Sequence, residues 1–135
     1  CSLYAPDAHT GRVVARMQRQ ALPLPLTWLH QLELRNALRL RVFRGEITPA
    51  QRDASLNALL ADVAAGVFAA AAPPLAETLT EAERLSALHT ETTGTRSLDV
   101  LHVSSALVLG LAEFLTLDHR QRALAKAAGL KVPAL

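Results

Sequence analysis

Three acidic residues in this chain could bind a divalent cation, and each lies where a secondary-structure element is expected to begin or end. They are Glu33 in WLHQLELRNAL, Asp99 in TRSLDVLHVSSAL and Asp118 in FLTLDHRQRALAKAAGL. Carboxylate oxygens suit Mg²⁺ and Mn²⁺, and crowded carboxylates repel one another until a cation offsets their charge. If the three side chains converge, they predict a metal-dependent site in which a bound water attacks a phosphodiester.

Each acid also has an explanation that needs no metal. Glu33 lies within the stripe of its helix expected to be buried, where an arginine partner would satisfy its charge as well as a cation. Asp99 lies in a first helical turn, where the macrodipole favours any anion. We expect Ser97 to cap this helix, which leaves Asp99 free to point away from the sheet. Asp118 follows FLTL and can be a plain N-cap. The stripe of the Glu33 helix is formed by Leu29, Leu32, Asn36, Ala37, Leu40 and Phe43.

The order of short apolar segments and longer helical ones predicts an α/β fold. After a turn at Ala5-Pro6-Asp7, we expect a helix through Val13, Val14 and Met17 within residues 4–20. We expect further helices over Thr27–Arg44, Thr48–Ala65, Glu77–Thr92, Ser97–Leu109 and from Asp118 to Gly129. We expect strands from Leu24, over Val67–Ala72 and Glu113–Leu117, and at the edge over Lys131–Leu135. Right-handed crossovers then give a parallel sheet with helices on both faces, whose carboxyl edge would gather the three acids.

Length and composition fit one domain over residues 1–135. Half of the 135 residues are apolar and aromatic residues are few, which favours helices packed on a sheet over an all-β barrel. The single cysteine, Cys1, rules out an internal disulfide and favours a cytoplasmic location. No apolar run reaches the length of a membrane span, so we expect no membrane partner.

The basic residues favour a polyanionic partner without requiring one. The net charge is only +2, but twelve of the fourteen bases are arginine. Arginine side chains match phosphate oxygens geometrically, although a solvated helix face would carry the same residues. The densest cluster is Arg35, Arg39, Arg41 and Arg44.

The segments that carry the three acids resemble the PIN-domain family, and most closely its VapC-type toxin ribonucleases. QLELRNALRLR is similar to the family's carboxylate-bearing helix, SLDVLHVSSAL to its Asp-Ala-Leu-His-like helix start, and TLDHRQRALAKAAGL to its Thr-x-Asp segment. The resemblance runs from Leu24 to the end of the chain. It implies a three-layer α/β/α fold with a central parallel sheet.

The resemblance also implies a function. It implies an endoribonuclease with Mg²⁺ or Mn²⁺ held by Glu33, Asp99 and Asp118, and pairing with a small antitoxin. The Thr116 hydroxyl would then support a ligand, and Arg96 would contact an RNA phosphate. Apolar residues beyond one stripe on the helices at 48–65 and 76–92 suit a homodimer or an antitoxin groove.

One feature of the family has no counterpart in this chain. PIN domains begin with a strand that ends in an aspartate, and this chain opens just after the corresponding point. We therefore expect residues 1–135 to be an N-terminally incomplete domain that is inactive alone.

Two other functions remain open. A PIN-like RNA- or protein-binding module without catalysis would pair the acids with arginines. A helical DNA-binding regulator would use Arg35 to Arg44 as a recognition helix and would not need a buried acid at Glu33.

Overall fold

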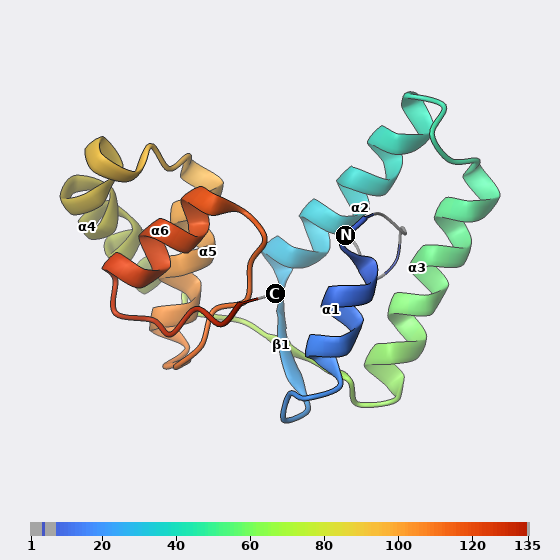
Figure 1. The fold of residues 1–135 in the computed structure, drawn as a ribbon, viewed down its shortest axis with the longest axis horizontal. Coiled ribbons are helices and arrows are strands. Elements are labelled where there is room, and N and C mark those ends of the chain that lie inside the picture. Colours follow the sequence, from blue (N-terminus) through green and yellow to red (C-terminus); the bar gives the residue numbers. More distant parts are fainter. Residues whose placement is uncertain (1–3, 5–7, 135) are drawn as a thin grey trace. The chain divides into compact units, whose positions relative to one another are not determined.

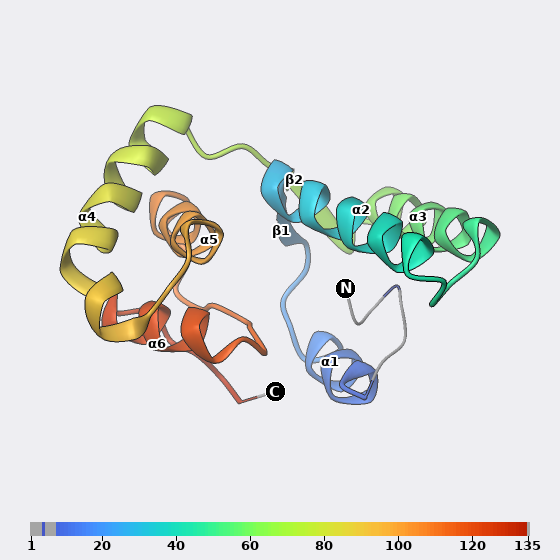
Figure 2. The same ribbon diagram turned by 90° about the horizontal axis from the view of Figure 1, so that it is seen from above.

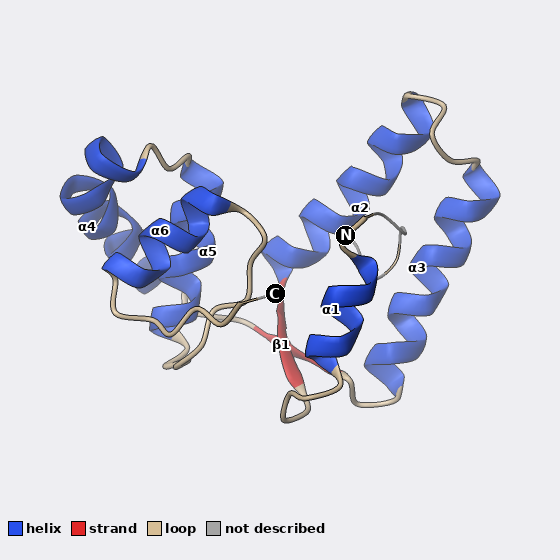
Figure 3. Ribbon diagram, viewed as in Figure 1, coloured by secondary structure: helices blue, strands red, loops and turns tan. Residues whose placement is uncertain are grey.

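The computed structural model describes Tyr4 and residues 8–134. Within these residues the chain is mixed α/β, with six helices and a two-stranded parallel sheet (Figures 1 and 3). Contacts divide the chain into two compact units, with the boundary between Ala72 and Pro73. The α/β class is thus confirmed, whereas a single domain over 1–135 stays a prediction. None of the helices in the described residues is long and apolar enough to cross a membrane.

The first unit is built around a parallel strand pair. Its elements are α1 (Thr10–Met17), β1 (Leu24–Thr27), α2 (Trp28–Phe43), α3 (Pro49–Ala64) and β2 (Phe68–Ala71). Strands β1 and β2 pair from Leu24↔Phe68 to Thr27↔Ala71. Parallel neighbours need a long crossover, and α2 and α3 supply it. The strands predicted from Leu24 and over Val67–Ala72 are therefore confirmed.

The two crossover helices begin where local sequence predicts. Thr27 is the N-cap of α2, and its hydroxyl accepts a hydrogen bond from the His30 backbone N–H at 3.4 Å. Thr48 caps α3 by accepting from the Gln51 N–H at 3.2 Å, while Gln51 Oε1 accepts from the Thr48 N–H at 2.8 Å. Pro49 follows at the first helical position, where no N–H is needed. These reciprocal bonds fix the start of α3 independently of tertiary packing.

The buried face of α2 differs from the predicted stripe. Leu29 and Leu38 are the buried residues of this helix, whereas Leu32, Asn36, Leu40 and Phe43 are exposed. Leu29 and Leu38 are nine positions apart, about two and a half turns, so they lie on opposite sides of the helix. The helix therefore buries different sides at different points along its length, and a single stripe was the wrong description.

The second unit packs three helices around one core. These are α4 (Leu75–Thr93), α5 (Ser97–Val108) and α6 (His119–Ala127), and each contacts the other two (Figure 2). Gly94 ends α4 in the left-handed conformation with φ of +63°, which glycine adopts without steric cost. The core residues are Ala82, Leu85, Val100, Val103, Ala106, Phe114, Leu124, Ala125 and Leu130.

The segment predicted as a strand over Glu113–Leu117 is not one. It makes a single parallel bridge, Glu113↔Lys131, in which the Phe114 N–H donates to the Lys131 carbonyl at 2.9 Å. The next rung of a parallel ladder would need an N–H from Pro133, which has none. Among the described residues, the predicted edge strand over Lys131–Leu135 is likewise reduced to this bridge. The predicted turn at residues 5–7 lies outside the described residues.

Candidate functional site

Asp99 is fixed by two hydrogen bonds at the start of α5. Its Oδ2 accepts from the backbone N–H of Arg96 at 2.9 Å, and its Oδ1 accepts from Gln121 Nε2 at 3.0 Å. The predicted Ser97 cap is wrong, because Arg96 occupies the N-cap position. Asp99, at the third position of α5, therefore satisfies the backbone N–H of the N-cap residue. Asp99 is only 9% exposed. Both carboxylate oxygens are held in place at the edge of the unit's core.

Gln121 joins Asp99 to Thr116. Its Oε1 accepts a hydrogen bond from the Thr116 hydroxyl at 2.8 Å, while its Nε2 donates to Asp99. Chemistry dictates this amide orientation, since a carboxylate can only accept and therefore requires the NH₂ group. Thr116 is only 7% exposed, so little water competes for these bonds. The result is a bridge between α5, α6 and the loop that precedes α6.

Asp118 is the N-cap of α6, as predicted. Its Oδ1 accepts from the backbone N–H groups of Arg120 at 2.7 Å and Gln121 at 3.1 Å. Partial burial acts to raise the pKa of Asp118, but these two bonds and the nearby His119 and Arg120 charges outweigh it. The pKa of Asp118 is consequently held below its usual range. This side chain stays ionised at neutral pH, as a cation ligand must.

Thr116 links Asp118 into the same network. Its hydroxyl accepts from the Asp118 backbone N–H at 3.0 Å and donates to Gln121. Both bonds of this oxygen go to the Asp118 backbone and to the Gln121 amide, so a supporting role of Thr116 toward a cation ligand stays a prediction. Arg122 adds a bond from Nη2 to the Thr116 carbonyl at 3.3 Å, which braces the loop. Its buried Nε has no hydrogen-bond partner among the described residues.

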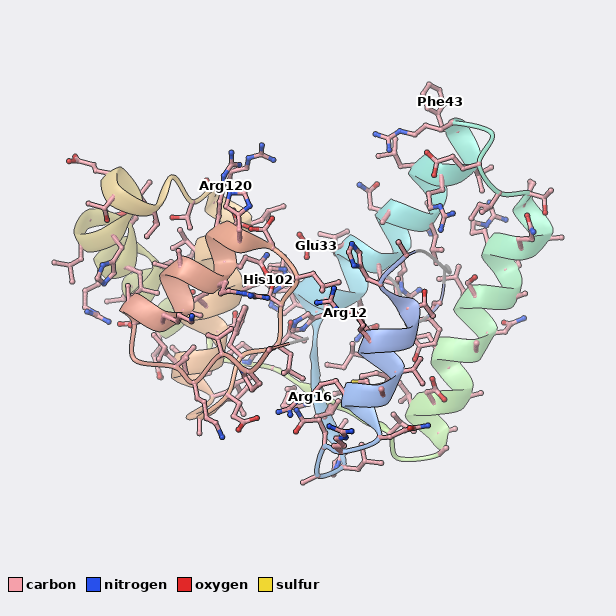
Figure 4. All side chains as sticks on the ribbon, in the orientation of Figure 1. Arg12, Arg16, Glu33, Phe43, His102 and Arg120 are labelled. Carbon is pink, nitrogen blue, oxygen red and sulfur yellow. The ribbon has the colours of Figure 1, made fainter. Side chains whose placement is uncertain are left out.

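The other residues considered from the sequence are Arg96, His102 and Glu33. Arg96 is exposed at the N-cap position of α5. Its role in contacting a phosphate stays a prediction. His102 is buried on α5 (Figure 4). Glu33 is half-buried on α2, in the first unit. Its convergence with Asp99 and Asp118 stays a prediction, because the two units are described separately.

The donor chemistry of Asp99 and Asp118 fits a hard cation. Asp99 and Asp118 offer carboxylate oxygens, which suit Mg²⁺ or Mn²⁺. Each carboxylate has about four acceptor positions, so the hydrogen bonds described above leave lone pairs for a ligand role. Within the described part of the chain, no group of three or more His, Cys, Asp or Glu side chains is placed to hold a metal ion.

Sequence reasoning missed Gln121, although a signal for it exists. Asp118 and Gln121 have the N-cap and third-position spacing of a capping box, in which the glutamine would reach back to the Asp118 N–H. In the structure the Thr116 hydroxyl takes that N–H instead. The amide of Gln121 is therefore released to reach Asp99, which is 22 positions away in sequence.

Comparison of the chain with models of known protein families and with curated proteins finds no match. The candidate site therefore rests on its own residues and geometry.

Proposed function

We propose that this chain is the metal-dependent endoribonuclease part of a PIN-type protein and hydrolyses RNA phosphodiester bonds. The observation that carries the proposal is the joining of Asp99 and Asp118 through Gln121 and Thr116. Gln121 bonds both acids: its side-chain amide donates to Asp99 Oδ1, and its backbone N–H donates to Oδ1 of the exposed Asp118 side chain. Asp99 and Thr116 are the buried members of this network, and the oxygens of its two carboxylates suit a cation site.

The proposed architecture is the three-layer PIN-like α/β/α fold. The parallel β1–β2 pair with its helical crossover supports a parallel sheet of this kind. In the proposed fold, Glu33 in the second turn of α2 joins Asp99 and Asp118 as the third ligand. Ligand sites of open parallel sheets gather at the carboxyl ends of strands, and Glu33 follows β1 closely.

In the proposed mechanism, the chain's own residues bind the cation, orient the carboxylates and neutralise phosphate charge. Asp99 and Asp118 present carboxylate oxygens, and the N–H groups of Arg96, Arg120 and Gln121 hold them in fixed directions. When bound, Mg²⁺ or Mn²⁺ supplies Lewis-acid stabilisation of phosphate charge and lowers the pKa of a coordinated water. We assign to Arg96, which is exposed at the start of α5, the contact to a phosphate oxygen of the substrate.

The proposed RNA contacts lie on α2 and are directed at the backbone. Arg41 and Arg44 already contact Glu46, at 3.0 and 3.9 Å, whereas the Arg39 side chain is exposed. Phe43 is 86% exposed and projects from the end of α2 (Figure 4), which offers a base one aromatic surface for stacking. Arginine contacts to phosphate carry no sequence information, so the proposal includes no sequence preference.

The proposed setting is a cytoplasmic toxin–antitoxin pair. Exposed apolar residues on α3 and α4 support a protein partner, either a second copy of the chain or a small antitoxin. These residues are Leu60, Val63, Leu75, Leu79 and Leu88.

The test is cleavage of labelled RNA by the full-length protein with Mg²⁺ or Mn²⁺, compared with Asp99→Asn and Asp118→Asn variants. We expect both substitutions to preserve the fold. Asparagine caps helices as well as aspartate, so α6 keeps its start. At position 99 the new amide can be satisfied if Gln121 flips, because the Thr116 hydroxyl can accept as well as donate.

We expect cleavage by the parent protein that is lost in EDTA, and a drop of at least about 100-fold in each variant, since the lost groups are ligands. Equal cleavage by all three proteins would reject the proposal. RNA binding with no cleavage in any of them would favour the non-catalytic binding module.

A further inference from the structure

The side-chain hydrogen bonds of Gln121 differ from those that its position in the helix predicts. At the third position of α6, a glutamine ordinarily bonds the N–H of its own N-cap residue, as Gln51 does with Thr48 in α3. In α6 the N–H of the N-cap residue, Asp118, donates to the Thr116 hydroxyl instead. The Gln121 side chain is then free of that bond and donates to Asp99 on α5. The same residue type at the same helical position therefore makes two different sets of bonds.

We propose that Gln121 is a positioning residue, which holds the Asp99 carboxylate in the orientation needed to bind a divalent cation. The inference rests on the proposed function, since it assigns a residue to the same site. Its Nε2–H bond fixes Asp99 Oδ1, and its Oε1 is anchored on the Thr116 hydroxyl. Residues that orient metal ligands in this way commonly contribute about 10- to 100-fold in metal affinity.

The network explains why a glutamine suits this position. The Asp99 side needs a donor and the Thr116 side offers a hydroxyl donor, so the bridging group must donate at one end and accept at the other. A neutral amide does both without placing another negative charge beside Asp99. Asp99 thereby keeps a fixed direction while its remaining lone pairs stay available to a cation.

The test measures Mn²⁺ affinity of the full-length protein by calorimetry or by electron paramagnetic resonance of free Mn²⁺. Gln121→Leu removes the bridge, and Gln51→Leu is the matched control at the same helical position of α3. Unfolding of each variant in EDTA identifies those that are folded at the assay temperature. Gln121→Asn, which shortens the amide by one methylene, replaces Gln121→Leu if the latter does not fold.

We expect Gln121→Leu to weaken Mn²⁺ binding about 10- to 100-fold, and Gln51→Leu to leave it unchanged. The decisive comparison adds Asp99→Asn. If Gln121 acts through Asp99, Gln121→Leu should cause no further loss in the Asp99→Asn background. A purely structural role would weaken binding by the same factor in both backgrounds.

The outcomes separate this inference from the proposed function. Mn²⁺ binding that depends on Asp99 but not on Gln121 overturns the positioning role and leaves the proposed function standing. An equal loss on Gln121→Leu with and without Asp99 also overturns it. Parent protein that binds Mn²⁺ no better than the Asp99→Asn variant overturns the cation site itself, and the positioning role with it.

Discussion

The buried hydroxyl of Thr116 should contribute to folding as well as to the candidate site. Thr116→Val keeps the shape of the side chain but removes the bond donated to Gln121 and the bond accepted from the Asp118 N–H. A net hydrogen bond is worth about 0.5–1.5 kcal/mol, and a buried group left without a partner costs about 1–3 kcal/mol. We therefore expect a loss of about 1–3 kcal/mol, which is a large share of a typical stability of about 5–15 kcal/mol.

The assay is urea denaturation followed by circular dichroism, with the slope m compared between variants so that a stability change is not confused with a change in the denatured state. The matched control is Thr80→Val on α4. Thr80 is exposed, and its hydroxyl only donates to the Ala76 carbonyl of the same helix at 3.0 Å. An exposed substitution of this kind should change stability by no more than about 0.5 kcal/mol.

Equal losses for Thr116→Val and Thr80→Val would refute this reasoning, because the buried network would then add nothing to the fold. A double-mutant cycle with Gln121→Leu sharpens the test. Residues that share one bond should show a coupling free energy of about 0.5–3 kcal/mol, whereas independent residues should show additive losses.

Three further predictions concern packing, capping and pH. Leu124→Ala in the core, where the side chain is 0% exposed, should cost about 2–5 kcal/mol by urea denaturation. Leu88→Ala, on a 59% exposed side chain, should cost at most about 0.5 kcal/mol, and similar losses would contradict the packing of α6. Asp118→Ala should cost about 0.5–2 kcal/mol in the same assay through loss of the N-cap, while Asp118→Asn should cost little. Burial and the hydrogen bond that Tyr4 donates to Asp62 at 2.6 Å raise the pKa of Tyr4, the sole tyrosine. Ultraviolet titration should show ionisation above the ordinary value of about 10, and Asp62→Asn should lower it. Since the folded pKa is raised, the associated stability is fully present below about pH 10 and is lost as pH rises through the folded pKa.

The starts of the helices could be predicted because their causes are local. Thr48 followed by Pro49 specifies a capped first turn within four residues, and Asp118 specifies its own cap. The strand pair was also predictable, because turn-forming residues bound two short apolar segments. For the helix starts, the physical cause lies within a few residues of the effect.

The buried side of α2 could not be predicted, because the helix carries apolar residues on more than one of its faces. Leu29, Leu32, Leu38 and Leu40 cover more than one face, so several stripes fit the sequence equally well. Which of them is buried depends on neighbours that are distant in sequence. The strand predicted at Glu113 failed for a similar reason, since a strand exists only if its partner can continue the ladder.

Capping and cation binding are not competing explanations for the two acids of the second unit. The sequence-based expectation separated the two roles, with Ser97 as the cap of α5 and Asp99 as the ligand. The structure gives Asp99 the bond to the Arg96 N–H and Asp118 the bonds to the Arg120 and Gln121 N–H groups. A carboxylate accepts about four hydrogen bonds or ligand contacts, so two bonds to N–H groups fix its direction without exhausting it. For Asp118, the bonds from the Arg120 and Gln121 N–H groups also help to hold the pKa below its usual range, which favours the ionised form that a cation requires. A helix start is therefore a means of orienting an anionic ligand, and evidence that an aspartate caps a helix does not count against its binding a metal.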